Sequence, residues 1–206
     1  MAVAMREPEL RIVDAANCTI IDLDPLQGTW SSDQYLRLAR ATNRLIEFTA
    51  GRIEVLPMPT KRHQAIAGFL YAALRTLMQQ IGGAVFFSGL ELQITPDKYR
   101  LPDILLLRDA VDPRGAGDPW LGADLVVEVV SPDNPERDTR TKRLDYAEVG
   151  VLEYWIVNPQ KETITVLRLA GKRYIEHAVF RRGETAISAL LPEFAVAVDE
   201  VLDARF

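Results

Sequence analysis

One short stretch, DLVVEVVSP at positions 124–132, limits the folds open to this chain of 206 residues. Five of its nine residues are leucine or valine. A short β-branched run bounded by proline predicts a strand that is buried on both faces of a sheet. Glu128 interrupts this run, and an uncompensated carboxylate there would cost on the order of several kcal/mol. The fold must therefore bring a compensating group to Glu128.

The first part of the chain combines weak and strong signals. Residues 1–28 contain proline and mixed patterns, and we interpret them as an N-terminal arm. The segment SSDQYLRLARA predicts a short helix that Ser31 or Ser32 caps. A hairpin is expected next, with its turn near Ala50–Gly51. An apolar period of 3.6 residues then predicts a long helix over residues 61–81, which a pair of glycines ends.

The second part of the chain is rich in predicted strands. Apolar and β-branched runs predict strands at 84–88, 90–95, 103–108, 124–130 and 153–157, a helix at 136–149, and antiparallel strands within 162–180 and 194–198. This order of elements predicts an α/β (α+β) fold, a mixed β-sheet flanked by helices, with additional antiparallel strands. We expect residues 29–206 to form a single domain, because no linker or repeat divides them.

Composition excludes several classes of protein. No apolar run approaches the ~18 residues of a membrane span, and the N-terminus lacks the apolar core of a secretory signal, so a cytoplasmic protein without membrane association is expected. A single cysteine, Cys18, excludes an internal disulfide and a cysteine metal cluster. Phosphate-binding glycine loops and a GxSxG nucleophile elbow are absent. The net charge of −5 argues mildly against an extended nucleic-acid surface, but not against a local basic cleft.

Two carboxylates and a lysine form the candidate chemistry. Asp103 enters an apolar strand directly after Pro102, and if that strand pairs with the one containing Glu128, both carboxylates can point into one pocket. Two close carboxylates repel each other, and a divalent cation with a preference for oxygen, such as Mg²⁺, removes the conflict. Asp138 and Lys142 are four residues apart, hence on one helix face, and Lys142 can present its ammonium group to the pair.

These residues carry a family resemblance. The run from PDILLLRD to DLVVEVVSPDNPERDTRTKRLDYAEVGVLEYWIVNP resembles the Uma-two family of restriction-type endonucleases, within the PD-(D/E)xK nuclease superfamily. The upstream segment EFTAGRIEVLPMP, followed by a histidine, is similar to the family's hairpin and helix start. The resemblance covers roughly residues 30–200 and implies a restriction-endonuclease-like core of α-β-β-β-α-β order.

The resemblance also implies roles for individual residues. Asp103 and Glu128 fall on the two metal-binding carboxylate positions, and the backbone carbonyl of Val129 would add a third ligand to Mg²⁺ or a substituting Mn²⁺. The superfamily's lysine normally stands two residues after the glutamate, where this chain has Val130. In relatives a lysine on the next helix takes that role, and Lys142 matches it.

Further residues are candidates with open alternatives. His63 precedes an apolar helical stripe by one turn and is either a core or capping histidine or an accessory site residue. Glu91 and, less strongly, Glu54 either join the pocket or lie on a solvated strand face. The basic residues after Glu128 are ordinarily a solvated face, but beside two carboxylates they suit contacts with a nucleic-acid backbone. These residues are Arg137, Arg140 and Arg143.

The sequence leads to a hypothesis and its rivals. The first is a Mg²⁺-dependent endonuclease that hydrolyses phosphodiester bonds of nucleic acid, with DNA as the expected substrate. The second is a catalytically inactive module with the nuclease fold that binds nucleic acid or a protein partner, which Val130 and the negative net charge favour. A third is an accessory factor of a toxin or transposon system. A homodimer is a further expectation, because nucleases that cut both strands are often dimers, although no interface can be read here.

Overall fold

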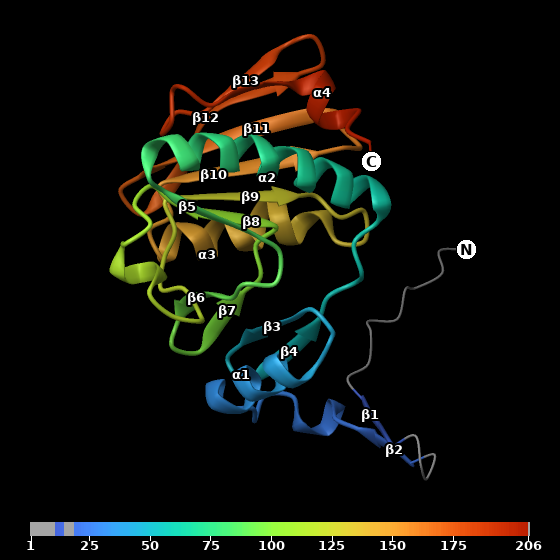
Figure 1. Ribbon diagram of the computed structural model, residues 1–206. Coiled ribbons are helices and arrows are strands. Elements are labelled where there is room, and N and C mark those ends of the chain that lie inside the picture. The colour runs from blue at the N-terminus through green and yellow to red at the C-terminus, as the bar shows by residue number, and fades with distance from the viewer. Residues whose placement is uncertain (1–10, 15–18, 206) are drawn as a thin grey trace, which may run out of the picture. The chain divides into compact units, whose positions relative to one another are not determined.

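The computed structural model describes residues 11–14 and 19–205, and within it the chain forms two compact units. The first comprises residues up to Met58 together with Thr95–Leu101, and the second comprises Pro59–Ile94 and the chain from Pro102 onward. Figure 1 shows the elements of both units. The prediction of an arm over 1–28 and a single domain over 29–206 stays a prediction.

The first unit is a small α/β structure. Its elements are β1 (Arg11–Asp14), β2 (Thr19–Asp22), η1 (Asp24–Leu26), α1 (Ser32–Ala41), β3 (Ile46–Thr49), β4 (Arg52–Val55) and β7 (Lys98–Arg100). Ser31, one of the two serines that the sequence predicted as the cap, caps α1 through a capping box. β3 pairs antiparallel with β4 and with β7. Tyr35 of α1 stacks on Phe48 of β3, and these rings form the centre of this unit's core.

The second unit is built on a six-stranded mixed sheet in the order β12-β11-β10-β9-β8-β5. The strands of this sheet are β5 (Ala84–Phe87), β8 (Ile104–Leu107), β9 (Leu125–Val129), β10 (Glu153–Asn158), β11 (Thr163–Ala170) and β12 (Arg173–Arg181). β6 (Leu92–Thr95) is not part of this sheet, and its first residue forms an isolated bridge with Trp120. β9 and β10 are parallel, whereas β8 pairs antiparallel with β9. The predicted mixed sheet with appended antiparallel strands is confirmed.

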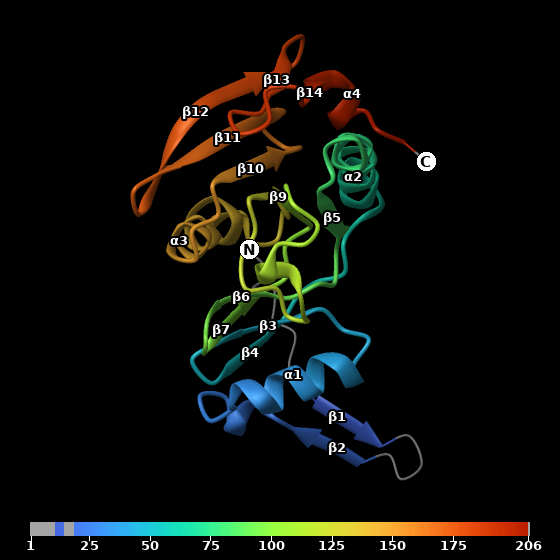
Figure 2. The same cartoon turned by 60° about the vertical axis from the view of Figure 1, so that its left-hand side comes forward.

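Helices cover both faces of this sheet (Figure 2). α2 (Lys61–Ile81), with the bounds the sequence predicted, packs on one face, where Ile66, Leu70 and Leu74 meet the alternate side chains of β8 and β9. α3 (Lys142–Glu148) packs on the other face through Tyr146 and Ala147. Because both faces are covered, β9 is buried along its whole length.

The remaining elements complete the second unit. A short 3₁₀ turn, η2 (Pro113–Gly115), precedes β9, and the chain ends with β13 (Thr185–Ile187), β14 (Ala195–Ala197) and α4 (Val198–Leu202), which packs against α2. Within the described residues no helix is long and apolar enough to cross a membrane.

One predicted element differs from the structure. The sequence predicted one α-helix over 136–149, but the segment begins with a π-helical turn, η3 (Arg137–Thr141), before α3 starts at Lys142. The hydroxyl of Tyr154 on β10 donates to the backbone carbonyl of Asp138 at 2.7 Å. A side-chain donor that enters the carbonyl ladder of a helix accounts for such a widened turn.

Candidate metal and phosphodiester site

Asp103 and Glu128 stand at one edge of the large sheet. The β8–β9 register pairs Ile104 with Val127, and one step further it brings Asp103 opposite Glu128. Residues directly opposite each other in an antiparallel pair share a face, with Cβ atoms about 5 Å apart. Leu105 and Val126, the next pair on that face, belong to the core under α3. Glu128 therefore lies on the face that α3 covers, and Asp103, directly before β8, lies beside it at the end of the sheet, as the sequence predicted if these strands paired.

Glu128 is only 2% exposed, and two donors meet one of its oxygens. Lys142 Nζ lies 2.8 Å from Oε1 of Glu128, and the hydroxyl of Tyr146 donates to the same Oε1. Burial raises the pKa of Glu128 well above its usual range. The Lys142 ammonium acts in the opposite direction, whereas the charges of Asp103 and Asp138 raise this pKa further.

The helix on this face contributes three side chains at a spacing of four residues. Asp138, Lys142 and Tyr146 follow one another along η3 and α3, and all three are buried. Lys142 Nζ lies 3.6 Å from Oδ1 of Asp138, so the ammonium sits between two carboxylates. Burial raises the pKa of Asp138, and the charge of Lys142 opposes this rise. The face that the sequence predicted for Asp138 and Lys142 thus points at Glu128.

Asp103 is held by donors from two directions. The backbone N–H of Val129 donates to its Oδ2 at 2.8 Å, and Nε2 of His63, in the first turn of α2, lies 3.0 Å from the same atom. Burial alone would lower the pKa of His63, but the hydrogen bond and the charge of Asp103 outweigh burial, and the pKa is raised. His63 Nδ1 is buried without a partner among the described residues. His63 thus lies beside Asp103, and its accessory role stays a prediction.

The structure gives the other candidate residues different surroundings. Glu91 precedes β6, and its carbonyl accepts a hydrogen bond from the backbone N–H of Trp120, but no hydrogen bond or ion pair in the described chain joins it to Asp103 or Glu128. Glu54 lies on β4 of the first unit, opposite Glu47.

The three predicted arginines also differ from one another. Arg140 is exposed and pairs with Glu136 at 3.6 Å. A terminal nitrogen (Nη2) of Arg143 donates to the carbonyl of Tyr174 at 3.0 Å, so this side chain packs against β12. Arg137 is half-buried at the start of η3. Burial is the largest effect on the pKa of Asp138 and raises it, whereas the charges of Lys142 and then of Arg137 lower it.

Sequence reasoning missed Tyr146 and Tyr154. Tyr146 continues the four-residue spacing of Asp138 and Lys142, so the helical period could have indicated it. Tyr154 comes from β10, and its hydroxyl reaches the site through the backbone of Asp138. No local sequence pattern predicts a contact between a strand residue and a helix carbonyl 16 positions away.

The donor set fits a hard divalent cation. The donors described above meet Oδ2 of Asp103 and Oε1 of Glu128, so the contacts within the described residues leave Asp103 Oδ1 and Glu128 Oε2 to accept a ligand. The described residues contain no group of three or more His, Cys, Asp or Glu side chains able to hold a metal by themselves. Mg²⁺ commonly binds through one or two carboxylates and completes its shell with water and substrate phosphate.

A mixed sheet with helices on both faces is the fold of the restriction-endonuclease-like class, and here two carboxylates and a lysine lie together at the ends of its central strands. The sequence matches the Uma2 family, described as "Putative restriction endonuclease", over residues 32–199, and the chain belongs to this family. The resemblance to this family that the sequence indicated is therefore confirmed.

A solved structure carries the same fold. It is the crystal structure of a putative nuclease belonging to DUF820 from Anabaena variabilis ATCC 29413, with a TM-score of 0.70 and 20% sequence identity. The alignment covers 84% of this chain and 98% of that one. At this identity the likeness shows the fold alone. Comparison with curated proteins finds no match.

Proposed function

We propose that this protein is a Mg²⁺-dependent endonuclease that hydrolyses phosphodiester bonds of DNA. The observation that carries the proposal is the placement of Asp103 opposite Glu128, with Lys142 Nζ 2.8 Å from the glutamate. Asp103, Glu128 and the backbone carbonyl of Val129 hold the cation, for which Mn²⁺ can substitute. When bound, the ion polarises the scissile phosphate and lowers the pKa of an attacking water.

The charge balance of the site supports a cation there. The carboxylates of Glu128 and Asp138 flank the ammonium of Lys142, and the charges of Asp103 and Asp138 raise the pKa of Glu128. A divalent ion between Asp103 and Glu128 relieves this repulsion and keeps Glu128 ionised. Glu128 thus has two compensating groups, a lysine on one oxygen and a cation on the other.

The protein's own side chains position the reacting groups. Lys142 and Tyr146 fix Oε1 of Glu128, so its other oxygen has a defined direction. The Val129 N–H and His63 fix Oδ2 of Asp103 in the same way. A buried ammonium beside the carboxylates also stabilises negative charge that develops on a phosphate, because it is positioned before the reaction begins. Lys142 thereby takes the role of the lysine that the superfamily normally has at the position of Val130.

Calorimetry with Mn²⁺ or Mg²⁺ tests the site without any guess about the substrate. Wild type is expected to bind at one or two sites, and Asp103→Asn is expected to lose this binding. Asp109→Asn is the matched control, because Asp109 lies beyond the opposite end of β8, where it accepts from the N–H of Val111.

Cleavage of supercoiled plasmid, oligonucleotides and RNA then tests the activity with the same three proteins. We expect metal-dependent cleavage of DNA by wild type and the control, and none by Asp103→Asn. Absence of metal binding in wild type, even with nucleic acid present, would refute the proposal and leave the non-catalytic module.

A further inference from the structure

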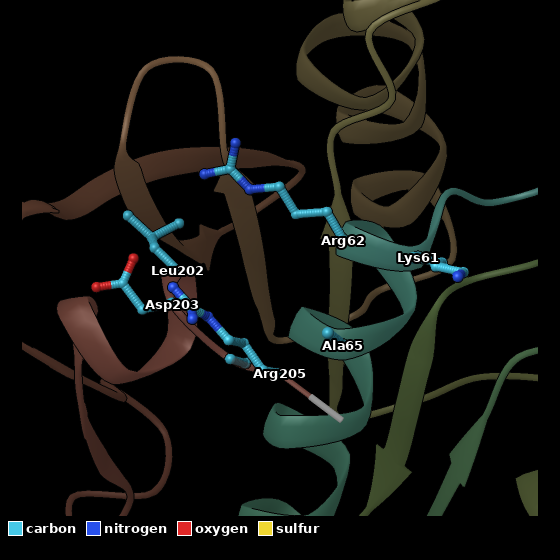
Figure 3. Close-up of a pocket in the computed structure, with 7 residues that line it drawn as sticks. Lys61, Arg62, Ala65, Leu202, Asp203 and Arg205 are labelled. Atoms are coloured by element: carbon cyan, nitrogen blue, oxygen red, sulfur yellow. The ribbon is translucent and has the colours of Figure 1, made fainter.

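A groove with three cationic side chains lies between the start of α2 and the chain that follows α4. It has a volume of about 670 Å³. The residues that line it are Lys61, Arg62, Ala65, Leu202, Asp203, Ala204 and Arg205. Figure 3 shows Arg62 extending from α2 toward the side of α4, and Lys61 pointing to the other side of the helix. Arg62 therefore faces the groove that Arg205 also lines, and the side chain of Lys61 points away from it.

The cations of the groove are available to a ligand. Lys61, Arg62 and Arg205 are exposed, and no ion pair in the described residues engages them. Asp203, the groove's carboxylate, already pairs with Arg182, whose Nη2 lies 2.9 Å from Oδ1. The hydrogen bond from Arg182 is the main cause that lowers the pKa of Asp203, and the charges of Arg205 and Arg62 lower it further, so this carboxylate stays ionised. The lining keeps an excess of positive charge that suits an anion.

The groove and the carboxylates lie at the same edge of the sheet. β9 and β10 are parallel, so their carboxyl ends, at Val129 and Asn158, meet at one edge, and Asp103 enters the antiparallel β8 there. A terminal nitrogen (Nη2) of Arg62 donates to the carbonyl of Pro159, directly after β10, at 3.4 Å. The first turn of α2 therefore contacts this edge at both places, Asp103 through His63 and Pro159 through Arg62.

This geometry sets the separation between groove and site. Asp103 on β8 and Pro159 after β10 are two strands apart, or about 10 Å at the usual strand spacing. That length corresponds to roughly three nucleotide steps of axial rise along one strand of DNA. A backbone with one phosphate between Asp103 and Glu128 thus reaches the groove within a few nucleotides.

We propose that the groove with Arg62 and Arg205 binds the phosphodiester backbone of DNA a few nucleotides from the scissile bond. This inference rests on the proposed function, because the position of the scissile phosphate comes from it. Guanidinium groups suit phosphate oxygens, since they donate two parallel hydrogen bonds. The groove contacts backbone and not bases, so it contributes affinity and register without sequence preference.

The salt dependence of DNA binding tests the groove separately from cleavage. A short fluorescent duplex is titrated with protein in EDTA over a range of KCl concentrations, and anisotropy gives the slope of log K against log salt. Each lost phosphate contact reduces the slope by about one, which corresponds to roughly tenfold weaker binding at low salt. We expect this change for Arg62→Ala and for Arg205→Ala, and a slope lower by about two for the double variant.

Two further variants make the result specific. Arg75→Ala is the matched control, because Arg75 is an exposed arginine of α2 about 20 Å further along the helix, and its slope should equal that of wild type. Arg62→Lys keeps the charge and should keep most of the slope. Thermal unfolding shows whether Arg62→Ala is folded; if it is not, Arg205→Ala decides, since Arg205 follows the last helix.

The outcomes separate the groove from the proposed function. Equal slopes for Arg62→Ala, Arg205→Ala and Arg75→Ala would overturn the groove, and so would a wild type that binds no DNA. If wild type cleaves DNA while the groove variants bind DNA as tightly as wild type, the proposed function is supported and the groove proposal is refuted. If the groove variants lose affinity but wild type cleaves no nucleic acid, the groove stands as a binding site and the endonuclease proposal falls.

Discussion

Glu128 and Lys142 are a buried ion pair whose members depend on each other. Both residues are buried, and the ammonium also lies 3.6 Å from Asp138. Breaking a buried pair by removal of one partner is strongly destabilising, because an uncompensated charge stays behind. Lys142 therefore has a structural task in addition to its proposed catalytic one.

Lys142→Met tests this dependence through pH. We expect a loss of about 3–5 kcal/mol at alkaline pH, and a smaller loss at acid pH. The pKa values of Glu128 and Asp138 are already raised by burial, and removal of the ammonium raises them further. The native variant then binds more protons than the unfolded chain above the ordinary carboxylate pKa, so its stability falls as pH rises. Urea unfolding at several pH values measures the effect.

A control and a second variant complete the test. Lys172→Met, in the exposed turn between β11 and β12, should change stability little at any pH. Adding Glu128→Gln to Lys142→Met removes one of the two stranded carboxylates and should restore part of the loss at alkaline pH. An equal loss at all pH values for Lys142→Met would show that packing, and not charge, is responsible.

At the scale of elements, the sequence predicted α2 better than the segment beginning at Arg137. The period of α2, its cap and its terminal glycine are all local: Thr60 accepts from the N–H of His63, and Gly82 has a φ of 81° in the left-handed region that glycine tolerates. The π-helical turn of η3 depends on Tyr154, a residue of a later strand. Only the folded sheet brings that hydroxyl to the helix.

The cap of α2 also sets the state of His63. Because Asp103 raises the pKa of His63, this histidine contributes stability below pH 6.5 that is lost as pH rises through its higher folded pKa. Thr60→Ala should cost about 1 kcal/mol, and by loosening the first turn it should move the pKa of His63 back toward 6.5. Proton NMR titration checks this, with His177→Gln to simplify the spectrum of the two histidines.

Ser31→Ala is the matched control for the cap. Ser31 caps α1 in the first unit with the same kind of hydrogen bond, which its hydroxyl oxygen accepts from the backbone N–H of Gln34. This variant should lose similar stability without moving the His63 titration. An equal shift of the His63 pKa in Thr60→Ala and Ser31→Ala would mean that this pKa depends on overall stability and not on the first turn of α2.

At the scale of the whole molecule, the candidate site was predictable where residues follow a period and not where the topology decides. Asp103 and Glu128 could be placed together only on the condition that β8 and β9 pair. The sequence of a single strand does not determine which strand it pairs with. The direction of the Lys142 side chain could be predicted from its spacing of four residues from Asp138 along a helix. The groove joins Arg62 with Arg205, which are 143 positions apart in the sequence, and no local pattern relates them.

Metal binding should stabilise the folded chain as a whole. A ligand that binds only the native state adds RT ln(1 + [L]/Kd), or about 2.7 kcal/mol at a hundredfold excess over Kd. For a chain of this size each kcal/mol raises Tm by about 2–4 °C, so saturating Mn²⁺ should raise the Tm of wild type by roughly 5–10 °C. Asp109→Asn should respond in the same way, and Asp103→Asn should not respond. A rise in Asp103→Asn equal to that of wild type would place the ion elsewhere, because an amide at position 103 cannot balance the charge of the cation as a carboxylate does.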